Sequence, residues 1–104
     1  MIDMLLFQNK IPFRYECQLV IGNHIIYPDF TIRHPNTGKL IYWEHFGLMD
    51  NPEYAKKTID KLQLYISHGF IPSISLITTY ETQSNPLTTE KISQIIKNFF
   101  LQCI

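Results

Sequence analysis

Two stretches decide the fold: residues 27–32, Tyr-Pro-Asp-Phe-Thr-Ile, and residues 40–47, Leu-Ile-Tyr-Trp-Glu-His-Phe-Gly. Both are rich in aromatic and β-branched residues, which favour β-strands. Each carries one acid, Asp29 or Glu44, within an otherwise apolar run. Burying an unpaired carboxylate costs on the order of several kcal/mol. Two such acids on neighbouring strands therefore indicate a shared partner, for which a divalent metal ion is the obvious candidate.

The sequence around these stretches predicts an antiparallel sheet. Residues 2–9 have the apolar spacing of a short amphipathic helix, which Pro12 ends. Turn-forming residues then separate runs that are typical of strands, and Gly22-Asn23 forms the first of these turns. The predicted strands form a three-stranded antiparallel meander and cover residues 13–21, 24–33 and 39–46.

After Gly47 the apolar period changes from that of a strand to that of a helix. Asn51 as N-cap and Pro52 at the first helical position predict a helix over residues 52–68. The β-rich run 74–80 follows this helix, so a crossover would place it parallel to an earlier strand. A last helix is predicted to begin at Thr88 or Thr89. The predicted order is α-β-β-β-α-β-α, an α/β fold with a mixed sheet.

The 104 residues suit one compact domain, residues 1–104, and the first helix starts without a capping residue, which favours a piece of a longer protein. The formal net charge is zero, so no overall positive field attracts nucleic acid. Cys17 and Cys103 lack the spacing of a metal knuckle or a redox pair. With no signal peptide and no apolar run of about 18 residues, we expect a cytoplasmic protein without a membrane span.

Strand alternation indicates where the two acids point. Asp29 should share a sheet face with Thr31, and Glu44 should share one with Phe46. In a meander these strands are neighbours, so both carboxylates are expected on one face, within reach of one ion. Oxygen ligands at this spacing suit Mg²⁺ or Mn²⁺ rather than zinc. Pro28 removes a backbone donor, which predicts that its strand is bent or lies at an edge.

The predicted helix 52–68 adds a cation. Lys61 lies at the edge of the apolar stripe, between Tyr54 and Tyr65. A lysine in this position can lay its stem along the core and present its ammonium group at one place. Next to two carboxylates and a metal ion, Lys61 would orient a water molecule or stabilise the charge on a phosphate.

Simpler interpretations remain open for each of these residues. A single acid in a strand usually faces solvent, and a lysine at a helix edge is usually solvated. The histidines lack zinc spacing, and no glycine-rich phosphate loop or nucleophile elbow is present. The residues by themselves therefore predict a small α/β domain with a candidate two-carboxylate metal site.

The element order, Pro28-Asp29 and the later Glu44 together resemble the PD-(D/E)XK, or restriction-endonuclease-like, nuclease superfamily. The resemblance implies that Asp29 and Glu44 bind Mg²⁺ and that the backbone carbonyl of His45 completes the coordination. The superfamily places a lysine two residues after its second acid. Phe46 stands at that position here.

The set of motifs resembles one branch of this superfamily, the nuclease-like domains attached to some bacterial superfamily-1 DNA helicases. These motifs lie within residues 2–81 and are Tyr15-Glu16, Pro-Asp-Phe at 28–30, Trp-Glu-His-Phe-Gly at 43–47, and Tyr54 with Lys61 seven residues later. In this branch the lysine stands on the following helix, which implies that Lys61 is the catalytic lysine. The resemblance also makes Glu16 a candidate for a further acid near the metal ion.

The resulting prediction is a Mg²⁺-dependent nuclease domain, with Mn²⁺ as the alternative ion, that hydrolyses DNA phosphodiester bonds. Asp29, Glu44, Lys61 and Glu16 are its catalytic candidates, and Arg14 and Lys57 are weaker candidates for contacts with the DNA backbone. Because the domain is small and neutral, we expect a homodimer or an attached helicase or DNA-binding domain. The alternative is an inactive nuclease-like fold used for nucleic-acid binding or assembly, which Phe46 favours and the two retained acids oppose.

Overall fold

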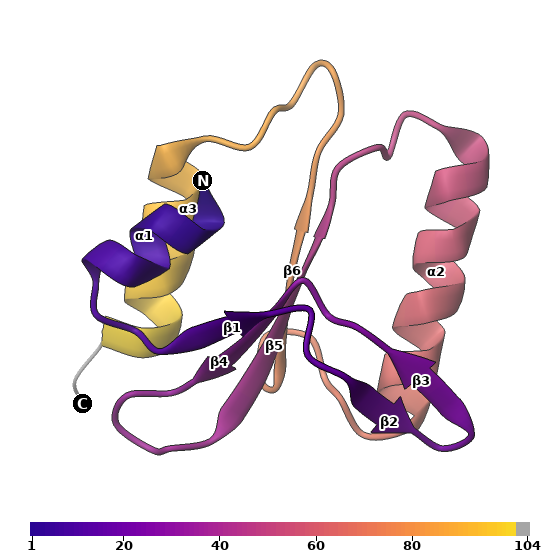
Figure 1. Cartoon of the computed structure of the whole chain (residues 1–104). Helices are drawn as coiled ribbons and strands as arrows, with labels where there is room; N and C mark the ends of the chain where they lie inside the picture. Colours follow the sequence, from indigo (N-terminus) through magenta and orange to yellow (C-terminus); the bar gives the residue numbers. More distant parts are fainter. Residues whose placement is uncertain (102–104) are drawn as a thin grey trace.

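The computed structural model describes residues 1–101, so Cys103 lies outside the described residues. A four-stranded sheet stands at the centre, with the order β1-β4-β5-β6. Helices α1 (Ile2–Gln8) and α3 (Thr89–Ile96) lie on one side of this sheet, and α2 (Pro52–Ser67) lies on the other (Figure 1). A short π-helical segment, Lys97–Leu101, continues α3.

The strands of the central sheet are β1 (Phe13–Tyr15), β4 (Phe30–Arg33), β5 (Leu40–Phe46) and β6 (Leu76–Tyr80). The pairs β1–β4 and β4–β5 are antiparallel, whereas β5 and β6 are parallel. The predicted α/β class and mixed sheet are confirmed. The predicted element order is also present, with one hairpin inserted between β1 and β4.

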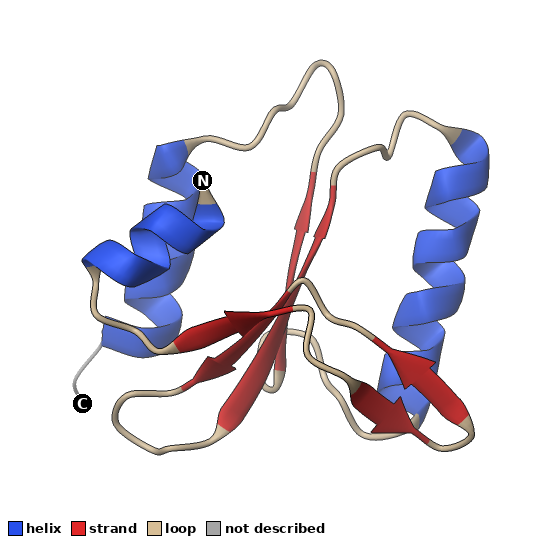
Figure 2. Cartoon of the chain, in the orientation of Figure 1, coloured by secondary structure: helices blue, strands red, loops and turns tan. Residues whose placement is uncertain are grey.

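The prediction of two long strands at residues 13–21 and 24–33 is wrong, because both are broken. Their inner halves, β2 (Leu19–Ile21) and β3 (His24–Ile26), form a separate two-stranded sheet beside α2 (Figure 2). Glu16 has a φ of 44°, a left-handed conformation that turns the chain out of the central sheet. The second break falls at Pro28, which has no N–H to donate to a neighbouring strand.

Strand β5 separates two hydrophobic clusters, because its side chains alternate between the faces of the sheet. Ile41 and Trp43 pack with residues of α1 and α3 in the larger cluster. Tyr42 packs on the opposite face with Tyr65 of α2 and Ile21 of the hairpin. Glu44 therefore points to the α2 side of the sheet, and the His45 side chain points to the α1 and α3 side.

Helix α2 begins as predicted. The Asn51 side chain accepts hydrogen bonds from the backbone N–H groups of Glu53 and Tyr54, which satisfies two otherwise unpaired donors. The Tyr54 hydroxyl accepts a hydrogen bond from the Gly47 N–H at 3.1 Å, and this contact ties the first turn of α2 to the end of β5. Within residues 1–101, no helix combines the length and apolar character needed to cross a membrane.

Candidate active site

Glu44 is the buried acid at the centre of the site, and only 2 % of its surface is exposed. Its Oε2 accepts a hydrogen bond from the Tyr65 hydroxyl at 2.8 Å and lies 2.5 Å from the ammonium nitrogen of Lys61. Its Oε1 accepts a hydrogen bond from the Asp29 N–H at 3.3 Å. The carboxylate is thus held by two side chains from α2 and by the backbone just before β4.

The sequence predicted Asp29 within a strand, but in the structure Asp29 directly precedes β4. Extending the Phe30–Trp43 register by one residue places Asp29 opposite Glu44. Its Oδ2 accepts a hydrogen bond from the His45 N–H at 2.7 Å. The Asp29 carboxylate therefore occupies the place of a strand partner at the free edge of β5.

The His45 carbonyl faces the same side of β5 as Asp29. The Phe46 carbonyl accepts a hydrogen bond from the Glu81 N–H at 2.8 Å, on the β6 side. Neighbouring peptide groups of a strand point to opposite sides, and the N–H and C=O of one residue point to the same side. Because the His45 N–H points to Asp29, its carbonyl does too.

These donors fit a hard divalent ion. Asp29, Glu44 and the His45 carbonyl offer oxygen atoms only, and Mg²⁺ typically takes one or two carboxylates and keeps several water molecules. Among residues 1–101, no group of three or more His, Cys, Asp or Glu side chains is arranged to hold a metal ion. An ion at this site would therefore rely on the carbonyl and on water for its remaining ligands, which suits Mg²⁺ or Mn²⁺ better than zinc.

Lys61 reaches Glu44 from the face of the sheet on which Phe46 also lies. Glu44 and Phe46 are two residues apart on β5, so their side chains share a face. Phe46 is 5 % exposed and stacks on Tyr80, with ring centroids 5.6 Å apart. The lysine of α2 thus supplies a cation on the face of β5 to which Glu44 and Phe46 point.

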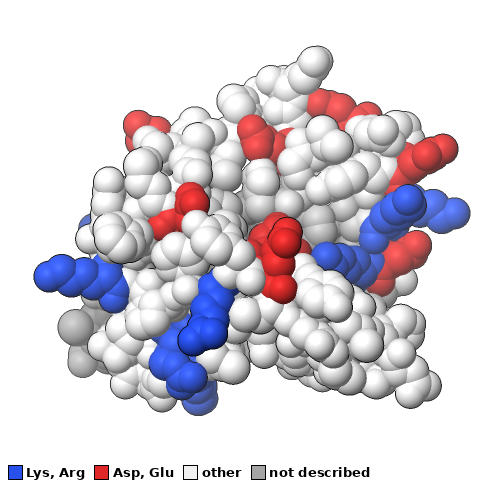
Figure 3. Space-filling model, in the orientation of Figure 1, with Lys and Arg blue, Asp and Glu red and all other residues white. Residues whose placement is uncertain are grey.

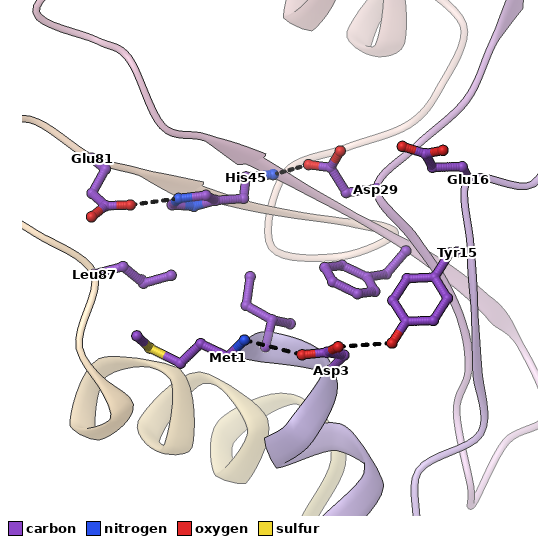
Figure 4. Close-up of a pocket in the computed structure, with 10 residues that line it drawn as sticks. Met1, Asp3, Tyr15, Glu16, Asp29, His45, Glu81 and Leu87 are labelled. Carbon is purple, nitrogen blue, oxygen red and sulfur yellow. Dashed lines mark hydrogen bonds and ion pairs between the residues drawn. The ribbon is translucent and has the colours of Figure 1, made fainter.

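Glu16 lies beside Asp29 but on a different surface from Lys61. Its N–H donates a hydrogen bond to the Asp29 carbonyl at 3.3 Å, and its side chain is exposed. Figure 4 shows the carboxylates of Glu16 and Asp29 in an open pocket of about 870 Å³ that Glu81 and Asp3 also line. Glu44 and Lys61 are not among its lining residues.

Tyr65 is a residue of this site that the sequence did not predict. Burial raises the pKa of its phenol well above the usual range, and the Glu44 carboxylate raises it further. The hydroxyl therefore remains a neutral donor to Glu44. The available signal was its position four residues after Lys61, which places both side chains on one helix face.

Two further polar residues escaped the sequence analysis, because no local pattern marks them. The His45 ring bonds to the Thr79 hydroxyl and to the Glu81 carboxylate, each at 2.8 Å. Both partners lie more than 30 residues away in the sequence and reach His45 through the pairing of β5 with β6.

No family model matches the chain, and no curated protein is similar enough to be matched to it.

Proposed function

We propose that this chain is a Mg²⁺-dependent nuclease domain that hydrolyses DNA phosphodiester bonds within a larger cytoplasmic DNA-processing protein. The observation that carries the proposal is the contact of Lys61 with Glu44, a buried carboxylate that also accepts a hydrogen bond from the Asp29 backbone. A lysine and two acids from three separate segments gather at one end of the sheet. This is the combination that the resemblance to PD-(D/E)XK nucleases requires.

Each residue of the site has a chemical task in this proposal. Asp29, Glu44 and the His45 carbonyl hold the metal ion, which when bound lowers the pKa of a water molecule and offsets negative charge on the phosphate. Lys61, in contact with Glu44, presents its ammonium group to the attacking water or the phosphate. Tyr65 and Lys61 together hold Oε2 of Glu44, so that Oε1 is the oxygen on the Asp29 side.

The charge distribution supports a role for another domain or subunit in DNA binding. In Figure 3 the upper part of the visible face carries acidic side chains, while Lys and Arg lie in its lower half and at the right. Arg14 on β1 and Lys57 on α2 are exposed and available to DNA phosphates. With a net charge of zero, we expect firm DNA binding to need a second subunit or an attached helicase or DNA-binding domain.

A plasmid-cleavage assay at low salt, with Mg²⁺, Mn²⁺ or EDTA, tests the proposal. Wild-type protein should nick or linearise DNA with either ion and not with EDTA. Asp29→Asn, Glu44→Gln and Lys61→Met should each lower the rate by about a hundredfold or more. The matched controls Asp60→Asn and Lys56→Met, both exposed on α2, should stay within a few-fold of wild type. Cleavage that survives Asp29→Asn, or a wild type without cleavage, contradicts the proposal.

An inactive binding module is the second candidate function. Phe46 is buried at the position of the usual lysine, and Oε2 of Glu44 is already held by two protein groups. This candidate predicts that wild type and Asp29→Asn bind a short DNA duplex equally well, without cleavage, and that EDTA does not change the affinity. The same proteins in a fluorescence anisotropy titration distinguish the two functions.

A further inference from the structure

The His45 side chain belongs to a second hydrogen-bond network, on the face of β5 opposite Glu44 and Lys61. We propose that His45, Thr79 and Glu81 form a clamp that positions the proposed metal ligands from the opposite face of β5. The clamp, named here the His45 clamp, fixes the end of β5 and so keeps the His45 N–H on the Asp29 carboxylate. This inference rests on the proposed function, because it assigns positioning residues to the same site.

Both nitrogens of the His45 ring are occupied. Nδ1 lies 2.8 Å from the Thr79 hydroxyl, and Nε2 lies 2.8 Å from Oε1 of Glu81 (Figure 4 shows the second contact). The Thr79 hydroxyl also accepts a hydrogen bond from the Trp43 indole N–H at 3.1 Å. An imidazole engaged at both nitrogens has a fixed orientation, and neither nitrogen is free to bind an ion.

One assignment of protons satisfies the whole network. The Trp43 indole can only donate, so the Thr79 oxygen accepts from it, and the Thr79 hydroxyl hydrogen is available for Nδ1 of His45. In this arrangement Nε2 is the ring nitrogen that donates to Glu81.

The clamp follows from the parallel pairing of β5 with β6. His45 lies directly opposite Thr79 in that pairing, and the chain reaches Glu81 two residues later. The Glu81 N–H also bonds to the Phe46 carbonyl at 2.8 Å. The end of β5 is thus held by β6 through both backbone and side chains.

On its other side the end of β5 has no neighbouring strand in the described sheet, because β4 begins at Phe30 opposite Trp43. Its contact there is the bond from the His45 N–H to Oδ2 of Asp29, at 2.7 Å. Any displacement of the His45 main chain would lengthen this bond and also move the His45 carbonyl. The clamp therefore acts on two of the proposed metal ligands without touching either Glu44 or Lys61.

Two matched pairs of variants test the clamp: Thr79→Val against Thr79→Ser, and Glu81→Ala against Glu81→Gln. The first member of each pair removes the hydrogen bond to His45, and the second keeps a hydroxyl or a carbonyl that can still bond to the ring. Glu90→Ala, which removes an exposed acid from α3, is the control for loss of charge. Glu81 is about a third exposed, so its replacement by Ala leaves a folded protein.

The first readout is the hydrogen exchange of the His45 backbone amide, measured by NMR without metal. Exchange should be faster in Thr79→Val and Glu81→Ala, and close to wild type in the other variants. The second readout is the Mg²⁺ concentration for half-maximal cleavage, which should rise about tenfold or more in the same two variants, with KM for DNA unchanged. A general structural loss would instead slow cleavage at every Mg²⁺ concentration, and Thr79→Ser and Glu81→Gln would then be slowed as well.

The outcomes separate the clamp from the proposed function. Unchanged exchange of the His45 amide in Thr79→Val and Glu81→Ala overturns the clamp, whatever the activity. A changed exchange rate with an unchanged Mg²⁺ requirement overturns its link to the metal ligands. A wild type that neither cleaves DNA nor responds to Mg²⁺ overturns the proposed function, while the amide measurement still decides whether the clamp holds His45 on Asp29.

Discussion

The ammonium nitrogen of Lys61 lies 2.5 Å from Oε2 of Glu44, and the two side chains differ greatly in burial. The Lys61 side chain is 32 % exposed, whereas that of Glu44 is 2 % exposed. Without Lys61, a buried carboxylate loses its only cation in the described contacts. Without the charge of Glu44, the lysine can turn towards water.

This difference predicts unequal costs of removing the two charges. Lys61→Met should lower the free energy of unfolding by about 2–3 kcal/mol, because it leaves Glu44 buried and partly uncompensated. Glu44→Gln should cost about 1 kcal/mol, and the double variant should lose less than the sum of the two. Urea denaturation of the four proteins measures this cycle. Equal and additive losses would show that the pair is not coupled.

Phe46 provides a test of the catalytic role proposed for Lys61. Its side chain shares a face with Glu44, so Phe46→Lys places a second ammonium group near the same carboxylate. We expect Phe46→Lys combined with Lys61→Met to recover at least about tenfold of the cleavage lost in Lys61→Met. Phe46→Met with Lys61→Met is the matched control and should recover nothing. Plasmid cleavage at saturating Mg²⁺ measures the rates, and equal activity of the two double variants would contradict this role for Lys61.

Tyr65 should remain protonated in the folded protein at any pH at which the fold survives. Burial, then the Glu44 charge, raises the pKa of its phenol beyond the usual range. Tyr65→Phe should leave the rise in tyrosinate absorbance unchanged up to the pH of alkaline unfolding. The same substitution should cost about 1–3 kcal/mol of unfolding free energy, because Glu44 loses a buried donor. Tyr27→Phe, at an exposed position, should leave the unfolding free energy close to that of wild type.

Binding of Mg²⁺ should stabilise the fold if Asp29 and Glu44 share an ion. A ligand that binds only the folded state adds about 2.7 kcal/mol at a concentration a hundred times its dissociation constant. Thermal unfolding followed by circular dichroism should therefore show a higher midpoint with Mg²⁺ than with EDTA. Asp29→Asn should abolish this shift, whereas Asp60→Asn should keep it. A shift that persists in Asp29→Asn would place the ion elsewhere.

Asp3 should titrate at unusually low pH because of Tyr15. The Tyr15 hydroxyl donates a hydrogen bond to Oδ2 of Asp3 at 2.7 Å, and this contact is the largest cause that lowers the Asp3 pKa to about 2. Because the folded-state pKa is depressed, the stability from this contact is present above the ordinary pKa of 3.8 and is lost as pH falls towards 2. NMR titration should show the Asp3 pKa rising in Tyr15→Phe. An unchanged value would exclude the hydroxyl as the cause.

Local sequence determined the elements whose signals are contiguous. Helix α2 follows from the Asn51 cap and Pro52, and β5 follows from an uninterrupted aromatic and β-branched run. The break at Glu16 was missed because the residues on either side of it have strand propensity, whereas Pro28 had indicated a bend in its strand. The left-handed turn at Glu16 depends on a partner, the Asp29 carbonyl, that lies 13 residues further along the chain.

The sequence also indicated the candidate site residues, since acids in apolar strands and a lysine at a helix edge can be recognised one segment at a time. Only the tertiary structure decided which of them meet. Lys61 contacts Glu44 because α2 packs on the face of the sheet to which Glu44 points, whereas the exposed Glu16 side chain lines a pocket that Lys61 does not reach. Thr79 and Glu81 reach His45 through the register of two parallel strands, and helical or strand periodicity carries no information on such a long-range pairing.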